Sequence, residues 1–255
     1  MKNIKLTLCY DGTHFHGWQK TFYPSIEEEL AKALLTALQQ RVKLQAASRT
    51  DAGVHAEGQI VNFILEENSV DLHKLQYSLN QLLPSSILVK EIEIAEDSFH
   101  PTTDATGKEY EYRLTTSKYL DPFKRNSHWH FPKKLDLDLM NDAAKLLIGK
   151  KDFKALTNFK IEPYTDTIRT LYRIEIREDK DDFLITILGD HFLYKMARNI
   201  AGLICYVGAG KIPLEDVENV LAQKLRKNAG MTAPAKGLTL KKIYYKNTIH
   251  AFAEN

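Results

Sequence analysis

Gly58-Gln59-Ile60-Val61-Asn62-Phe63-Ile64-Leu65 is the stretch from which the fold can be worked out. Its β-branched and aromatic side chains predict a strand. A shorter strand is expected before it, at about residues 42–48. The turn Thr50-Asp51-Ala52-Gly53 lies between the two strands, because Asp and Gly are typical turn residues. This part of the chain therefore predicts paired strands joined around an acidic turn.

Further elements lie on both sides of this pair. Residues 3–10 alternate between apolar and polar side chains and predict a strand. Ser25 and Glu28 form a capping-box pattern that begins a helix, and Asp71 begins a second helix that is followed by a strand at 87–94. The resulting order, β-α-β-β-α-β, is the ferredoxin-like arrangement that RNA-recognition modules also use.

The second part of the chain repeats this alternation in part. Strands are expected at about 108–116, 168–177, 182–189 and 238–246, and helices at about 136–148, 191–207 and 213–226. The predicted fold class is α+β, built as two ferredoxin-like or RRM-like α/β halves with antiparallel sheets. The predicted domains are residues 1–105, which contain the acidic turn, and residues 106–255.

Composition excludes several classes of protein. With 255 residues, 44% hydrophobic and 27% charged, the chain is neither collagen-like nor disordered. Its 35 Lys and Arg against 33 Asp and Glu exclude a uniformly basic surface but allow a local one. The first residues lack a signal-peptide pattern and the longest uncharged apolar run, 200–210, is too short to span a membrane, so a cytoplasmic protein is expected. Cys9 and Cys205 are expected to be buried free thiols.

Asp51 and Arg49 are the first candidate site residues. If the strand continued to Asp51, the two side chains would share one face, because side chains in a strand alternate. The simpler interpretation is that Asp51 caps a turn in which Gly53 adopts a positive φ. The sequence pattern leaves both open.

Tyr110 and Arg198 are the candidates in the second half. Tyr110 and Tyr112 fall on one face of a strand, where they are either core residues or a stacking platform for an unpaired base. In the helix expected over 191–207, His191, Lys195 and Arg198 would line one face, either as a solvated charged surface or as a basic contact.

Basic clusters favour an RNA partner. Residues 224–246 contain seven Lys or Arg and no acid, and residues 124–134 contain four, interleaved with aromatic residues. The pairs His14/His16 and His128/His130 suggest a metal site, but neither pair has a third ligand at recognisable spacing, so no metal is expected.

The segment Ser48-Arg49-Thr50-Asp51-Ala52-Gly53-Val54-His55-Ala56 resembles the TruA-type tRNA pseudouridine synthases. The resemblance extends over essentially the whole chain, in ordered motifs at residues 10–19, 79–84, 107–113, 149–153, 192–199 and 233–238. Such a series is far more specific than any single motif.

This resemblance implies the pseudouridine synthase fold and an isomerase, an intramolecular transferase, that converts uridine to pseudouridine at positions 38 to 40 of the tRNA anticodon stem-loop. It implies Asp51 as the catalytic carboxylate, Arg49 in displacing the target base, Tyr110 stacking on that base and Arg198 pairing with Asp51. It also implies no cofactor, a homodimer, and a second domain that completes the active-site cleft. Pro101-Thr102 and His191 depart from the family pattern, which expects a small residue with Arg and a Gly at these places.

Two alternatives use the same residues differently. A non-catalytic tRNA-binding module would need the basic clusters and tyrosines but not Asp51. A metal-dependent hydrolase would use the four histidines His14, His16, His128 and His130. Product formation distinguishes the first alternative, and metal analysis distinguishes the second.

Overall fold

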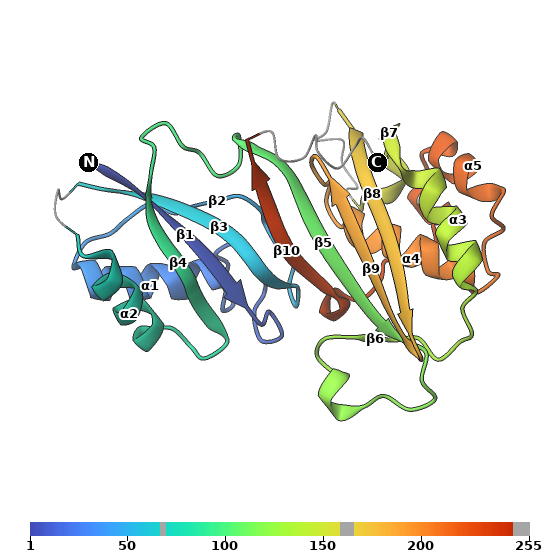
Figure 1. Ribbon diagram of the computed structural model, residues 1–255, viewed down its shortest axis with the longest axis horizontal. Coiled ribbons are helices and arrows are strands. Elements are labelled where there is room, and N and C mark those ends of the chain that lie inside the picture. The colour runs from blue at the N-terminus through green and yellow to red at the C-terminus, as the bar shows by residue number, and fades with distance from the viewer. Residues whose placement is uncertain (67–69, 159–165, 247–255) are drawn as a thin grey trace. The chain divides into compact units, whose positions relative to one another are not determined.

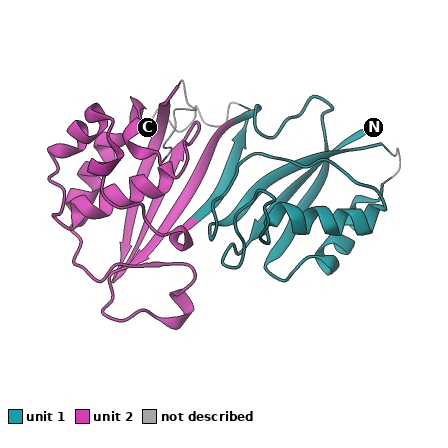
Figure 2. Cartoon of the chain, turned by 180° about the vertical axis from the view of Figure 1, so that it is seen from behind, with its two compact units in different colours: residues 1–105, 239–246 teal, residues 106–238, 247–255 magenta. Residues whose placement is uncertain are grey.

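The computed structural model describes residues 1–66, 70–158 and 166–246, which form two compact units (Figures 1 and 2). The first unit comprises Met1–Ala105 together with Thr239–Lys246, and the second runs from Thr106 to Leu238. The sequence-based division assigns all of 106–255 to one domain. In the structure, residues 239–246 join the first unit because their strand pairs in parallel with a strand of that unit, at His55 and Ala56.

The first unit is a mostly antiparallel sheet with two helices against one face (Figure 1). The antiparallel strands β4, β1 and β3 are neighbours in that order, and β2 and β10 both pair with β3. Its elements are β1 (Lys2–Tyr10), α1 (Ile26–Leu38), β2 (Gln45–Ala46), β3 (His55–Leu65), α2 (Leu72–Leu82), β4 (Ile87–Ala95) and β10 (Leu238–Tyr245).

Local chemistry determines where the helices of this unit begin. The Ser25 hydroxyl accepts a hydrogen bond from the Glu28 N–H (3.4 Å), and the Asp71 carboxylate accepts one from the Lys74 N–H (3.0 Å). Each bond satisfies an N–H that the first helical turn leaves unpaired. Both predicted helix starts are confirmed. The strand predicted at 42–48 is shorter, since only Gln45–Ala46 pairs with β3.

The second unit has the same type of construction. Strands β5, β9, β8 and β7 are antiparallel neighbours, and β6 pairs in parallel with β5. Helices α3, α4 and α5 pack on one side of these strands (Figure 1). Its elements are β5 (Ala105–Thr115), η1 (Pro122–Lys124), β6 (Trp129–His130), α3 (Leu137–Leu147), β7 (Gly149–Asp152), η2 (Lys154–Leu156), β8 (Ile168–Asp179), β9 (Asp182–Gly189), α4 (Met196–Gly208), α5 (Asp216–Gln223), η3 (Arg226–Asn228) and η4 (Ala235–Gly237).

The helix predicted over 191–207 begins later, at Met196. Lys195 has a φ of 60°, in the left-handed region, and so cannot continue a right-handed helix toward the N-terminus. The prediction that His191, Lys195 and Arg198 line one helical face is therefore wrong, since the first two precede α4. The fold is a mixed α/β one, and none of its described helices is long and apolar enough to cross a membrane.

Candidate active site

Asp51 lies in the turn that leads into β3. The Val54 N–H donates to the Asp51 carbonyl (3.1 Å), and Gly53 has a φ of 77°. Because β2 ends at Ala46 and β3 begins at His55, no strand continues to Asp51, and the condition under which Arg49 and Asp51 would share one face of a strand is not met. Arg49 is exposed and Asp51 is half-buried, so the structure places both side chains on the same turn with access to solvent.

The loop between β1 and α1 holds this turn in place. The Trp18 N–H donates to the Thr50 carbonyl (3.0 Å), and the Gly53 N–H donates to the Phe15 carbonyl (3.2 Å). The Tyr10 hydroxyl forms a hydrogen bond with the buried Thr50 hydroxyl (2.9 Å). The backbone is thus fixed on both sides of Asp51, which limits the positions that its carboxylate can take.

Two glycines let the loops approach this closely. A Cβ atom on Gly12 would lie 2.0 Å from the Val54 carbonyl oxygen, and one on Gly17 would lie 2.5 Å from the Thr50 carbonyl oxygen. Gly17 also has a φ of 93°, which disfavours other residues. Both glycines lie in the motif at residues 10–19, but their packing role was not predicted from the sequence.

Gln59 supports the other end of the turn and was also missed. Its side-chain amide donates to the Ser48 carbonyl (2.6 Å), and its Oε1 accepts from the Ser48 N–H (3.2 Å). Gln59 is fully buried in β3, next to the buried apolar residues Ile60 and Val61. A glutamine beside a run of apolar strand residues is the signal that could have identified it, because a buried amide needs partners.

Tyr110 and Tyr112 both point into the second unit from β5. Tyr110 is 7% exposed and meets the edge of Phe192, with ring centroids 4.8 Å apart. Tyr112 is completely buried, and its hydroxyl donates to the Pro234 carbonyl (2.9 Å). Tyr112 is therefore a core residue with a satisfied hydroxyl. On the same strand, burial lowers the pKa of Lys108 to about 8.

Arg198 lies in the first turn of α4 and is tied to the same segment as Tyr112. Its Nε donates to the Ala233 carbonyl (2.8 Å), while the Ala233 N–H donates to the Arg198 carbonyl (3.2 Å). Burial raises the pKa of Tyr112, and the Arg198 charge opposes this rise. The structure thus brings Arg198 and Tyr112 to one short segment, 233–234.

A polar network centred on Arg226 fixes the surroundings of Arg198. The Arg226 guanidinium donates to Asn158 Oδ1 (3.2 Å), the Gly230 carbonyl (2.7 Å), Asn199 Oδ1 (2.8 Å) and Thr232 Oγ1 (2.6 Å). Asn199, next to Arg198 in α4, is fully buried. Sequence reasoning counted Arg226 as part of a basic cluster, whereas its hydrogen bonds make it a structural residue.

We expect Arg226→Met to lower the free energy of unfolding by about 2 to 3 kcal/mol, because it removes the charged donor from Oδ1 of the buried Asn199 and from Oδ1 of the half-buried Asn158. Urea denaturation followed by circular dichroism measures this loss. Lys227→Met, at the adjacent exposed position, is the matched control and should change the value by less than about 0.5 kcal/mol. Equal effects of the two variants would contradict the structural role of Arg226.

Several lysines of the predicted basic clusters have acidic partners from distant parts of the chain. Lys224 pairs with Asp152 (2.6 Å), Lys241 with Glu57 (2.5 Å) and Lys246 with Glu96 (3.3 Å). Lys124 likewise pairs with Asp182. The absence of acids within 224–246 therefore does not leave this segment uncompensated. Lys224 and Lys246 are themselves exposed, and the other exposed basic residues of the clusters are Arg125, Lys133, Lys134, Lys227 and Lys242.

The histidine pairs make other contacts. His16 stacks on Tyr23 with centroids 4.4 Å apart, and His130 Nε2 lies 2.9 Å from the Ser117 carbonyl oxygen. Within residues 1–66, 70–158 and 166–246, no three His, Cys, Asp or Glu gather in a way that could hold a metal ion. Cys9 and Cys205 are free thiols, as predicted, but only Cys205 is fully buried.

The positions that depart from the expected family pattern also have defined surroundings. The Pro101 carbonyl accepts from the Tyr245 hydroxyl (2.8 Å), and the Thr102 hydroxyl donates to the Ala46 carbonyl (2.9 Å). His191 is exposed, and its N–H donates to Asp190 Oδ1 (2.5 Å). These contacts tie residues 101–102 to the first unit and leave the His191 side chain in solvent.

Comparison with known proteins connects this geometry to a family. A family profile described as tRNA pseudouridine synthase matches residues 143–246. tRNA pseudouridine synthase A 2 of Protochlamydia amoebophila is 45% identical over 96% of this chain and 95% of its own length. tRNA pseudouridine synthase A of Bacillus subtilis is 41% identical over 96% of this chain and 99% of its own. Identity at this level over nearly the full length of both chains shows common descent, and the chain belongs to the tRNA pseudouridine synthase A family of isomerases.

Proposed function

We propose that this protein converts uridine to pseudouridine at positions 38 to 40 in the anticodon stem-loop of tRNA, with Asp51 as its catalytic carboxylate. The observation that carries this proposal is the similarity, over nearly the whole chain, to relatives named tRNA pseudouridine synthase A. The turn geometry supports it as well. A half-buried carboxylate on a backbone held from both sides can be presented to a substrate in one orientation.

The reaction rearranges bonds without gain or loss of electrons. The bond between uracil N1 and ribose C1′ breaks, the base turns, and a bond forms between C5 and C1′. The C5 proton is lost to water, and N1 ends with a proton. Because the product is an isomer of the substrate, the chemistry requires no nicotinamide, flavin or ATP.

Asp51 has two possible roles in this sequence of steps. Its carboxylate either attacks C1′ as a nucleophile or removes the proton at C2′ as a base. Both roles require the ionised form, which a nearby positive charge favours in a site that excludes water. Arg49 on the same turn and Arg198 on α4 supply such charge in this proposal, since a guanidinium stays protonated under all physiological conditions.

The free-energy cost of displacing the target base from the stem has to be offset by new contacts with the protein. Unstacking a base costs a few kcal/mol, and stacking it on an aromatic side chain returns about 1–3 kcal/mol. In this proposal Arg49 occupies the space that the base leaves, and Tyr110 receives the base. The edge contact between Tyr110 and Phe192 holds the tyrosine ring in place.

The wider architecture belongs to the same proposal. Residues 1–105 form one ferredoxin-like half that contains the Asp51 turn, supported by the element order β-α-β-β-α-β in the first unit. Residues 106–238 form the second half and supply Tyr110 and Arg198. The enzyme acts as a homodimer in the cytoplasm, binds tRNA as its partner and uses no cofactor.

Tritium at uracil C5 provides the test. An unmodified tRNA transcript labelled at this carbon should release tritium to water when incubated with the protein and chelator, because C5 exchanges its hydrogen for the bond to C1′. Chemical mapping should place the product at positions 38 to 40, and a transcript with cytidines at these positions should give none. Tight binding without tritium release would instead support a non-catalytic tRNA-binding module.

We expect Tyr110→Phe to keep most of the activity and Tyr110→Ala to lose about 5- to 150-fold in kcat/KM, because phenylalanine keeps the stacking face and alanine removes about 1–3 kcal/mol of stacking. Initial rates of tritium release over a range of tRNA concentrations measure both effects. A severe loss in Tyr110→Phe would assign the role to the hydroxyl and contradict the stacking role of the ring.

A further inference from the structure

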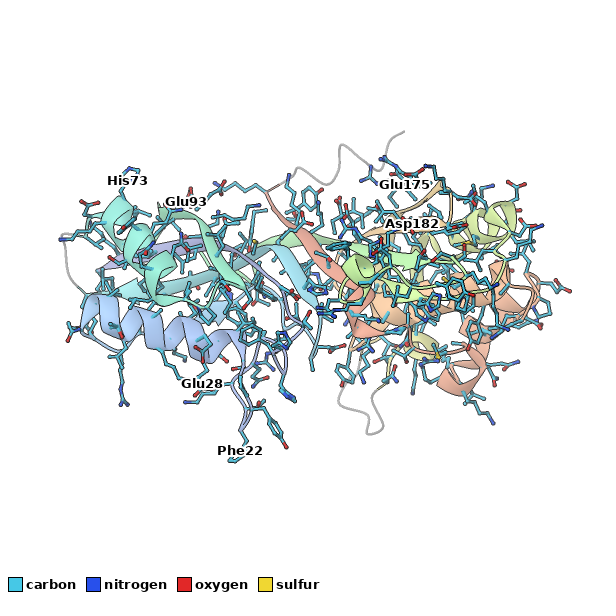
Figure 3. The ribbon with its side chains drawn as sticks, turned by 90° about the horizontal axis from the view of Figure 1, so that it is seen from below. Phe22, Glu28, His73, Glu93, Glu175 and Asp182 are labelled. Carbon is cyan, nitrogen blue, oxygen red and sulfur yellow. The ribbon has the colours of Figure 1, made fainter. Side chains whose placement is uncertain are left out.

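Two exposed aromatic rings lie at the end of the loop between β1 and α1. The aromatic tip is defined as Lys20-Thr21-Phe22-Tyr23-Pro24. The Phe22 side chain is 97% exposed and Tyr23 is 56% exposed. Figure 3 shows Phe22 projecting away from the body of the first unit. Burying a phenylalanine side chain is worth about 1.5–3 kcal/mol, so a ring left this exposed is a surface available to a partner.

The rings of the aromatic tip are arranged before any partner binds. Tyr23 is stacked on His16, with centroids 4.4 Å apart and ring planes at 21°. Phe22 meets Tyr23 edge-on, at 5.6 Å and 88°. The Thr21 hydroxyl donates to the Tyr23 carbonyl (3.1 Å) and accepts from the Tyr23 N–H (3.2 Å). A partner that stacks here loses little entropy in ordering these side chains.

The base of the loop is bound to the turn that contains Asp51. The His16 N–H donates to the Pro24 carbonyl (2.9 Å) and closes the loop. Two residues after His16, the Trp18 N–H donates to the Thr50 carbonyl (3.0 Å), adjacent to Asp51. Backbone hydrogen bonds therefore connect the loop that carries the aromatic tip directly to the Asp51 turn within the first unit.

We propose that Phe22 and Tyr23 stack on an unpaired base of the tRNA substrate and position that RNA for the Asp51 turn. The inference rests on the proposed function and adds a contact outside the reacting atoms. Every nucleobase offers a flat face to an aromatic ring, and Lys20, an exposed residue two positions before Phe22, suits the neighbouring phosphates. Two side chains offer far less surface than the roughly 800 Å² per partner that a stable protein interface buries.

An anticodon stem-loop hairpin with 2-aminopurine at each loop position in turn tests this contact, because stacking quenches the fluorescence of this base. At one loop position, wild-type protein should quench the signal, and Phe22→Ala or Tyr23→Ala should weaken binding of the hairpin about 5- to 150-fold, the equivalent of about 1–3 kcal/mol. Phe22→Trp should restore binding, since it keeps a ring. Tyr77→Ala is the matched control, because Tyr77 of α2 is also a 68% exposed aromatic in the first unit.

The salt dependence of binding separates stacking from phosphate contact. Phe22→Ala should leave the slope of log Kd against log salt unchanged, whereas Lys20→Ala should reduce it by about 1. A hairpin that lacks the quenched base should bind wild type and Phe22→Ala equally. An unchanged Kd in Phe22→Ala, a changed slope, or a change of oligomeric state in sedimentation would overturn the proposal.

Catalysis is measured separately from hairpin binding, by tritium release, so that a failure of the proposed function can be distinguished from a failure of the stacking proposal. If the wild type releases no tritium but the hairpin data respond as described, the proposed function fails and the stacking contact stands. If tritium release is normal and Phe22→Ala changes neither Kd nor KM, only the contact fails. The expected result for Phe22→Ala is a raised KM with kcat within about threefold of wild type, as for a contact made equally in the ground and transition states.

Discussion

The Asp51→Asn variant should release tritium from C5-labelled tRNA at least about a thousandfold more slowly than wild type at saturating substrate. Asparagine has nearly the shape of aspartate, so the turn and its hydrogen bonds to Phe15 and Trp18 should persist. The amide, however, can neither attack C1′ nor accept the C2′ proton. The Kd for tRNA should stay within about threefold, since Asp51 acts on the reacting atoms more than on affinity.

Asp11→Asn is the matched control for this experiment. Asp11 is a partly exposed carboxylate in the loop that holds the Asp51 turn. Partial burial raises its pKa, but hydrogen bonds from Thr13 and the neighbouring His55 outweigh this, so the pKa is lowered overall. This carboxylate is therefore ionised at neutral pH, like a catalytic one, yet its loss should reduce kcat by less than about tenfold. Full activity of Asp51→Asn would remove Asp51 from the mechanism.

The elements predicted best from the sequence are those that local contacts determine. Ser25 and Asp71 accept bonds from N–H groups three residues away, so their pattern is visible within a short window. The start of α4 was predicted wrongly because a distant contact decides it. The Tyr194 carbonyl accepts from the Thr157 hydroxyl (3.2 Å) and the Asn158 N–H (3.4 Å), and Lys195 turns left-handed. Leu193 lies at helical spacing from Met196 and Ile200, so the apolar pattern alone extends the predicted helix past its true start.

The same distinction between local and distant contacts applies to the candidate site. Arg49 and Asp51 could be selected because they lie within one short motif. The partners that hold the motif, such as Gly12 and Gln59, come from other elements, and sequence spacing says nothing about their approach. The prediction of an uncompensated basic cluster from the charge pattern was wrong for the same reason. Lys224 and Lys241 look uncompensated along the chain, but Asp152 and Glu57 meet them in space.

Gly12→Ala should both destabilise the protein and slow its reaction, although the substitution adds one methyl group and touches no reacting atom. The new Cβ would lie 2.0 Å from the Val54 carbonyl oxygen and 2.7 Å from the Val54 carbonyl carbon. Backbone atoms cannot move aside as a flexible side chain can. The loop would have to separate from the turn, which would also weaken the bond from the Gly12 N–H to His55 Nδ1 (3.1 Å).

We expect this separation to lower the free energy of unfolding by about 3 to 5 kcal/mol, at the upper end of the cost of overpacking. Because the Val54 N–H is hydrogen-bonded to the Asp51 carbonyl, the Asp51 carboxylate should shift as well. A misplacement of about 1 Å costs about a hundredfold in kcat. Urea unfolding and tritium release measure the two effects. Gly210→Ala is the control, since Gly210 has a φ of 66° but, among the described residues other than its chain neighbours, no atom lies within 4 Å of its Cβ position, so the substitution adds only backbone strain of about 1 kcal/mol. Normal kcat in a folded Gly12→Ala protein would show that the Asp51 turn does not depend on this close approach.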